Sequence, residues 1–145
     1  MNKFLKQMAL FLVVLSLMLI MTSCKYSINS EEAQLYLNDF LSAIEAHDYE
    51  TMVDLFHSEH RVPTDFFQDF IEREESEDNI DFSLGVTLKE ITKREGAVYD
   101  SKVNGAYRKL SLQIVIGTED ENVLKDMTIT FVKNANGFGI WDFSM

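Results

Sequence analysis

Two histidines lie three residues apart in the segment His57-Ser58-Glu59-His60, and imidazoles at that spacing can share one metal ion on a helical turn. A zinc-protease helix instead places its histidines four residues apart around a catalytic glutamate, and this segment does not match that pattern. No third ligand is near in the sequence, although His47 or Asp48 could approach in the folded chain. The sequence therefore favours a polar, solvent-exposed helix end, and we predict no metal ligands here.

An acidic cluster is a second candidate, this time for calcium. It places six carboxylates within ten positions: Glu72, Glu74, Glu75, Glu77, Asp78 and Asp81. Calcium requires several oxygens that converge on one point, usually with a glycine that turns the loop. The cluster has neither a glycine nor alternating aspartates, so it is typical of a solvated helix end and loop. The run Glu119-Asp120-Glu121 could likewise be a calcium site or a solvated loop, and its position fits the tip of a hairpin better than a calcium site.

Motifs for nucleophilic catalysis and phosphate binding are missing from the sequence. No Gly-x-Ser-x-Gly elbow occurs anywhere in the chain. The Gly137-Phe138-Gly139 segment belongs to an expected hairpin with no helix after it, so it does not form a phosphate-binding loop. We therefore expect neither a cofactor nor a catalytic nucleophile.

Cys24 is the only cysteine, and the residues before it indicate its chemistry. Lys3 and Lys6 open the chain, an uncharged run follows from 7 to 21, and Met21-Thr22-Ser23 precedes the cysteine. The run has the length of a signal-peptide core and falls short of the roughly 20 residues that a membrane-spanning helix needs. This layout resembles the signal of bacterial lipoproteins, although Met21 stands where that family usually has leucine. The resemblance implies that Cys24 is the lipid attachment site.

The lipoprotein resemblance also implies the division and location of the chain. Residues 1–23 would be removed as a signal peptide, 24–30 would form a lipidated tether, and 31–145 would form a single domain. The domain would be lipid-anchored to a cell membrane on its extracytoplasmic face. As alternatives, an ordinary secreted protein would carry an unpaired thiol into an oxidising compartment, and an uncleaved anchor would be short and lack a stop-transfer flank.

The charge of the chain restricts its partners. The sequence has 13 basic and 24 acidic residues, a net charge of −11, and loss of Lys3 and Lys6 leaves −13. Such a surface repels nucleic-acid phosphates and anionic lipids, so we predict no nucleic-acid partner and membrane attachment through the lipid anchor. A protein partner, a small apolar ligand and a homodimer remain open.

Apolar residues recur at helical spacing in three segments of the domain. The first helix is expected from Ser30, as its N-cap, to Ala46, and a second over 49–56. A third follows Pro63, with Thr64-Asp65 as its cap. After Asn79 the period changes to two, which predicts short extended segments at 86–91, 97–99, 107–116, 127–131 and 139–144, with turns at 118–122 and 134–137.

This order of elements predicts an α+β fold, in which N-terminal helices pack on one face of a curved antiparallel sheet. The segment from Asp48 to Phe56 resembles the second helix of the cone-shaped, cystatin-like or nuclear-transport-factor-2-like fold, and the segment from Phe131 to Phe143 is similar to its last hairpin. Aromatic residues at helical spacing are expected in the core, but three would line the cone if its interior is open: Phe40, Phe56 and Trp141.

The cone-fold resemblance raises an enzymatic alternative, because some members are isomerases or dehydratases with an acid or histidine base and tyrosine donors in a dry pocket. The residues of these types fall in no motif that assigns a role: Tyr36, Asp39, Asp54, Tyr99, Asp100 and Tyr107. Asp39 and Asp54 lie on the polar sides of their helices. We therefore predict a membrane-tethered, extracytoplasmic, non-catalytic binding or interaction domain. The alternatives are a small enzyme using the cone cavity, or an acidic immunity- or decoy-type protein.

Overall fold

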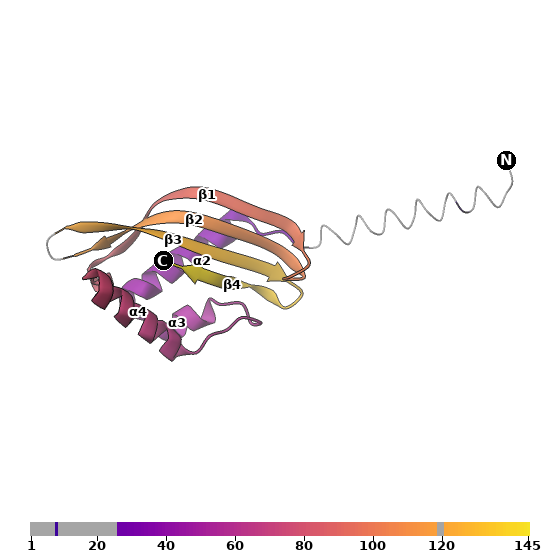
Figure 1. Ribbon diagram of the computed structural model, residues 1–145. Helices are drawn as coiled ribbons and strands as arrows, with labels where there is room; N and C mark the ends of the chain where they lie inside the picture. The colour runs from indigo at the N-terminus through magenta and orange to yellow at the C-terminus, as the bar shows by residue number, and fades with distance from the viewer. Residues whose placement is uncertain (1–7, 9–25, 119–120) are drawn as a thin grey trace.

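The computed structural model describes Met8 and residues 26–118 and 121–145. Cys24 and the predicted signal peptide, residues 1–23, lie outside this range apart from Met8, so cleavage and lipidation stay predictions. Three helices come first in the described domain: α2 (Ser30–Ala46), α3 (Tyr49–Asp54) and α4 (Thr64–Asp78). A short 3-10 helix, η1 (Phe82–Leu84), leads into the strands β1 (Val86–Asp100), β2 (Gly105–Gly117), β3 (Asn122–Asn134) and β4 (Gly137–Ser144) (Figure 1). Of the helices described, none is both long and apolar enough to cross a bilayer.

Helix α2 begins one residue earlier than the sequence suggested. Asn29 is its N-cap, and the Asn29 Oδ1 atom accepts the backbone N–H of Glu31 at 3.0 Å. Ser30, which was predicted to cap the helix, is its first helical residue. The helix ends at Ala46, and the left-handed φ of 52° at the following residue, His47, allows the chain to turn into α3.

The caps of the next two helices differ from each other. Asp48 caps α3, because its side chain accepts the backbone N–H of Thr51 at 3.1 Å. Pro63 occupies the N-cap position of α4 and makes no side-chain cap bond. The prediction that Thr64-Asp65 caps this helix is therefore wrong, since Thr64 is already helical.

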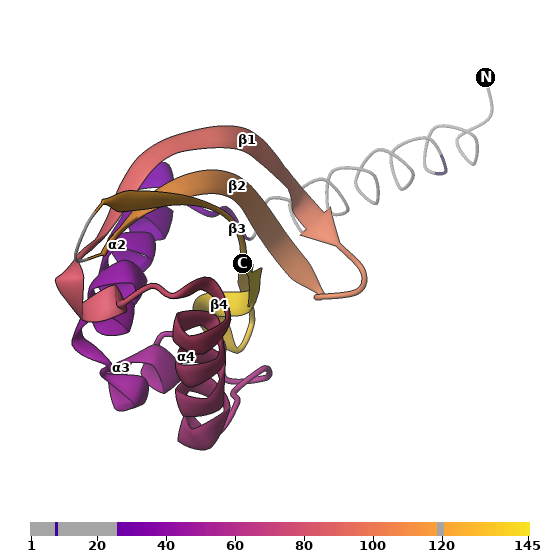
Figure 2. The ribbon, with the colours of Figure 1, turned by 60° about the vertical axis from the view of Figure 1, so that its left-hand side comes forward.

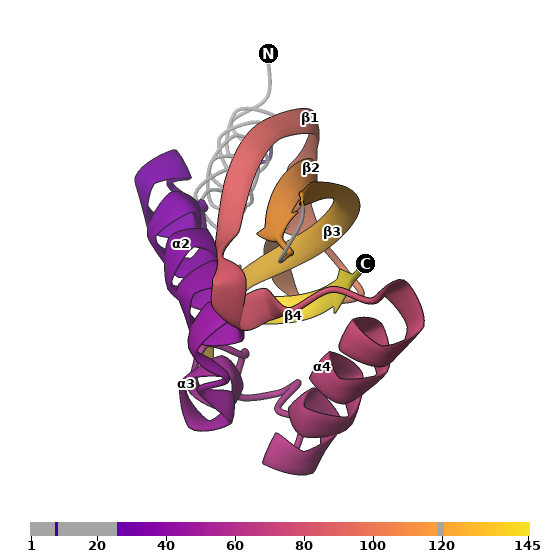
Figure 3. The same cartoon turned by 90° about the vertical axis from the view of Figure 1, so that its left-hand side faces the viewer.

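The four strands form an antiparallel meander in the order β1-β2-β3-β4. The two short segments predicted over 86–99 are one continuous strand, β1, interrupted only by irregularities in its register with β2. The sheet curls over the helices, so that α2 runs beneath its concave side and α4 stands near β4 (Figures 2 and 3). This arrangement confirms the predicted α+β architecture.

The core lies between the helices and the inward face of the sheet. Alternate residues of β2 face inward as predicted, and Leu112, Ile114 and Ile116 are at most 1% exposed. Their neighbours on β3 continue the same layer, because Leu112 pairs with Met127 and Leu110 with Ile129. The core also includes Ile28, and Tyr26 packs against it. Packing thus begins at Tyr26, the first residue of the described domain.

Candidate functional site

Aromatic rings from α2, α4, β4 and the segment after α3 pack against one another in the interior of the domain. The Phe143 ring of β4 lies 5.1 Å from Phe40 on α2 and 6.0 Å from Phe67 on α4, measured between centroids. Phe56 lies 5.3 Å from Phe67 and closes the cluster. Phe40 and Phe67 are 0% exposed. The interpretation of Phe40 and Phe56 as core residues is therefore the correct one.

The three histidines have separate partners. His57 is 1% exposed, so the prediction of a solvent-exposed helix end is wrong for this residue. His60 is exposed, as predicted, and stacks on Trp141 at 4.2 Å. His47 Nε2 lies 3.0 Å from Oε1 of Glu75, a residue of α4. Within the described residues, no group of three or more histidines, cysteines or acids is placed to hold a metal ion.

The hydrogen bonds of His57 define its tautomer. The backbone N–H of Glu59 donates to Nδ1 at 3.2 Å, so Nδ1 carries the lone pair. The proton is then on Nε2, which donates to Oδ1 of Asn134 at 3.1 Å and to the Gly137 carbonyl at 3.2 Å. The Asn134 amide nitrogen donates to Glu59 Oε2 at 2.6 Å, and this bond lowers the pKa of Glu59. A buried histidine with both nitrogens engaged in this way is a structural group.

The acidic cluster is divided among structural contacts. The Glu75 carboxylate accepts the backbone N–H of Phe82 in addition to pairing with His47. Asp81 caps η1 through the N–H of Ser83, and its pKa is lowered by the hydrogen bonds from Ser83. Lys125 on β3 bonds Asp78 and lies 3.9 Å from Glu74 on α4. These carboxylates therefore join α4 to its neighbours and do not converge on one point.

The residues considered for acid–base catalysis are likewise dispersed. Asp39 and Asp54 are exposed, as predicted. Tyr36 packs edge-on against Phe138 at 4.7 Å, and the Tyr99 hydroxyl bonds Asn104 at 3.4 Å on the surface. None of these contacts pairs a carboxylate with a tyrosine.

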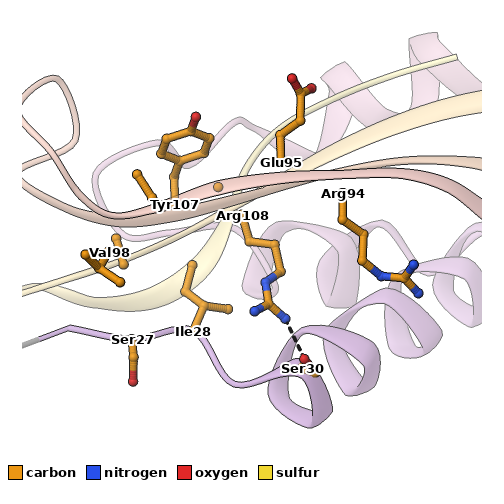
Figure 4. Close-up of a pocket in the computed structure, with 11 residues that line it drawn as sticks. Ser27, Ile28, Ser30, Arg94, Glu95, Val98, Tyr107 and Arg108 are labelled. Carbon is orange, nitrogen blue, oxygen red and sulfur yellow. Dashed lines mark hydrogen bonds between the residues drawn. The ribbon is translucent and has the colours of Figure 1, made fainter.

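A hollow lies between the start of the domain and strands β1 and β2, and no residue of the aromatic cluster lines it. It measures about 470 Å³ and has walls from Ile28, Val98 and Ala106. Arg94 and Arg108 line it from the two strands, and both side chains point toward α2 (Figure 4). The sheet register explains why both arginines lie on one face. Arg108 pairs with Gly96, and Arg94 lies two residues before Gly96 on the same face of β1.

The two arginines of this hollow have no carboxylate partner among the described residues. Arg108 Nη1 donates to the Ser30 hydroxyl at 2.8 Å, which places the guanidinium beside the first turn of α2. Arg94 is exposed, and its side chain makes no hydrogen bond or ion pair within the described part of the chain. Glu95 points to the opposite side of the strand, where it pairs with Lys93 at 3.0 Å. No sequence motif marks this pair, although basic residues are concentrated around it.

Comparisons with known proteins show the fold alone. No protein-family model and no curated protein sequence matches the chain. Pgp2, the helical cell shape determining protein of Campylobacter jejuni, matches 83% of this chain with a TM-score of 0.51 at 14% identity. The match covers 44% of Pgp2, so the chain spans less than half of that protein's length.

Two further structures match this chain over most of their own length. The benzoate 1,2-dioxygenase β subunit of Burkholderia mallei matches 81% of this chain and 89% of its own, with a TM-score of 0.48 and 8% identity. A nuclear-transport-factor-2-like family protein of Streptomyces avermitilis matches 78% of this chain and 92% of its own, with a TM-score of 0.45 and 14% identity. At these low identities, the likeness to both structures concerns the arrangement of helices and strands and nothing further.

Proposed function

We propose that the protein is an extracytoplasmic lipoprotein, held to the membrane by a lipid on Cys24, whose domain is a non-catalytic binding module. The packed interior is the observation that supports the binding role. An isomerase or dehydratase of this shape needs an enclosed pocket that shifts the pKa of a base. Here Phe40, Phe67 and Phe143 occupy that space, so recognition is assigned to the outer surface.

The sequence before the domain supports the membrane tether. Thr22 and Ser23 are small enough for a peptidase that cuts before Cys24, and the lipid would then be carried by the only thiol of the chain. Core packing begins at Tyr26 and Ile28, so the anchor would be separated from the folded domain by only a few residues. The domain would therefore be held at the membrane surface.

Substitution of Cys24 tests the tether. The full-length Cys24→Ala variant, expressed in a bacterium and labelled with a radioactive fatty acid, should accumulate as an unlabelled and uncleaved precursor. Ser23→Ala is the matched control, because alanine is also small and should permit cleavage and labelling. A Cys24→Ala protein that is cleaved and retained at the membrane like the wild type would contradict the proposal.

A further inference from the structure

Basic residues are concentrated in the hairpin of β1 and β2. We call residues 89–109 the basic arm. It contains six basic and three acidic residues, a net charge of +3. The remainder of residues 24–145 has five basic and 21 acidic residues, a net charge of −16. Because exposed charges are screened beyond about 10 Å at 0.1 M salt, a nearby surface responds to the local charge of the arm more than to the net charge of the domain.

The hollow within the basic arm has the chemistry of a phosphate site. Arg94 and Arg108 approach it from neighbouring strands, and neither guanidinium is neutralised by a carboxylate of the described residues. Glycine at position 96, opposite Arg108, adds no side chain to the space between the two arginines. Guanidinium groups bind phosphate oxygens through paired N–H donors, so two of them can hold one phosphate from two sides. The acids Glu31 and Glu32 of α2 line a separate depression with Leu35 and Lys133.

The position of the hollow points to the membrane as the source of the phosphate. Ser27 and Ile28 line it, and this start of the described domain lies at the turn end of the arm (Figure 1). Ser27 is three residues from Cys24, which is at most about 11 Å of extended chain. A lipid on Cys24 would therefore hold the hollow at the depth of the lipid headgroups.

Exposed side chains with apolar parts on the basic arm are also suited to contact with a membrane surface. Val98 is 64% exposed and Tyr99 is 53% exposed near the end of β1. Tyrosine is enriched at membrane interfaces, where its ring contacts lipid and its hydroxyl stays in water. Lys102 in the adjoining turn is exposed and adds positive charge.

From these observations we infer that the basic arm docks on the membrane and that Arg94 and Arg108 bind the phosphate of an anionic phospholipid. The inference rests on the lipid anchor of the proposed function, which brings the arm to the bilayer. The domain is then fixed in orientation, with its acidic remainder turned away from the negatively charged surface.

Hydrogen exchange of the lipidated protein in nanodiscs tests this docking. One set of discs contains phosphatidylcholine alone, and the other contains one third phosphatidylglycerol. We expect amides of residues 89–109 to exchange about fivefold more slowly in the anionic discs, since each basic group near such a surface strengthens binding by about that factor. Raising the salt to 1 M, where the screening length falls to about 3 Å, should abolish the difference.

Charge-matched variants identify the residues responsible. The double variant Arg94→Gln/Arg108→Gln should lose the dependence on phosphatidylglycerol. Arg94→Gln alone, which breaks no side-chain hydrogen bond or ion pair of the described residues, should weaken it. The control Arg61→Gln/Arg73→Gln removes the same charge from the α4 side of the domain and should retain the dependence. Equal exchange in both kinds of disc, or an unchanged effect in the Arg94→Gln/Arg108→Gln variant, would overturn the inference.

Two further measurements separate the remaining outcomes. Glycerol phosphate added to phosphatidylcholine discs should not slow exchange at millimolar concentration, and a slowing equal to that of phosphatidylglycerol would reassign the hollow to a soluble phosphate compound. Mass spectrometry of the same preparation shows whether Cys24 carries lipid. Lipidated protein without a response to anionic lipid would overturn the docking alone, whereas protein without lipid would overturn the anchor.

Discussion

The Nε2 atom of His57 lies 3.1 Å from Oδ1 of Asn134, which is 77 residues later in the chain. Asn134 also donates to the Val103 carbonyl at 2.9 Å, and its Oδ1 atom accepts the backbone N–H of Asn136 at 2.9 Å. One buried side chain therefore connects the segment after α3 to the β1–β2 turn and the β3–β4 turn. Among the described residues, every buried polar side-chain atom has a hydrogen-bond partner, so this network is complete.

We predict that His57→Ala and Asn134→Ala each lower the free energy of unfolding by about 1–3 kcal/mol, because each leaves buried polar partners unsatisfied. Urea unfolding followed by circular dichroism measures the change. His60→Ala is the control, since this histidine is exposed and loses only its stacking on Trp141 and one surface bond. A larger loss for His60→Ala than for His57→Ala would contradict the assigned role of the network.

Glu59 should make stability depend on pH. The hydrogen bond from Asn134, with a lesser contribution from Asn136, lowers the pKa of Glu59 below its ordinary value of 4.5. A carboxyl whose pKa is lower in the folded state stabilises the fold above the unfolded pKa and loses this effect as pH falls through the folded pKa. Glu59→Gln should therefore destabilise the protein at pH 7, and the difference from wild type should vanish in acid.

Unfolding free energies of both proteins between pH 7 and pH 2 measure this difference. Glu90→Gln, exposed on β1, is the matched control for loss of one negative charge. A Glu59→Gln difference that grows as the pH falls would show that the Asn134 bond does not favour the charged carboxylate.

Neighbouring phenylalanines on α4 offer a test of the packed interior. Phe67 is 0% exposed inside the aromatic cluster, whereas Phe66 is 45% exposed. Phe67→Ala should lower the free energy of unfolding by about 3–5 kcal/mol, since it removes a buried ring and leaves a cavity. Phe66→Ala, the same chemical change one residue away, should cost clearly less. Similar losses at both positions, measured by urea unfolding, would show that the interior is not packed as described.

Local patterns in the sequence account for the part of the fold that was predicted correctly. The apolar stripe of α2 buries Leu37, Phe40 and Ile44, because residues three and four apart share one face of a helix. The alternation in β2 likewise places Leu112 and Ile114 inward. Both patterns depend on residues within a few positions of each other, so they can be read without knowledge of the tertiary structure.

The side-chain groups that the sequence did not reveal depend on contacts between residues far apart in the chain. His57 is buried because it meets Asn134, and the polar segment around it gave no sign of that contact. Arg94 and Arg108 share a face only through the register of β1 with β2, which has irregularities at three places. The concentration of basic residues over 89–109 was the available signal, but its position beside the start of the domain follows only from the fold.

Gly139 shows how closely β4 approaches the segment after α3. The His57 backbone N–H donates to the Ile140 carbonyl at 2.7 Å, and the Ile140 N–H donates to the Leu55 carbonyl at 2.9 Å. A Cβ atom at position 139 would lie 2.5 Å from the His57 nitrogen and 2.7 Å from its Cα. These are backbone atoms, so they cannot move aside without shifting the chain.

We therefore predict that Gly139→Ala separates the two segments and lowers the free energy of unfolding by about 1–3 kcal/mol. Amide exchange of His57 and Ile140 should become faster in this variant, because the bonds that their N–H groups donate to the Ile140 and Leu55 carbonyls lengthen. Gly137→Ala is the comparison: its Cβ would meet nothing within 4 Å, and only its φ of 124° opposes a side chain. Exchange at His57 that stays at the wild-type rate in Gly139→Ala would show that the steric contact is not what holds this approach.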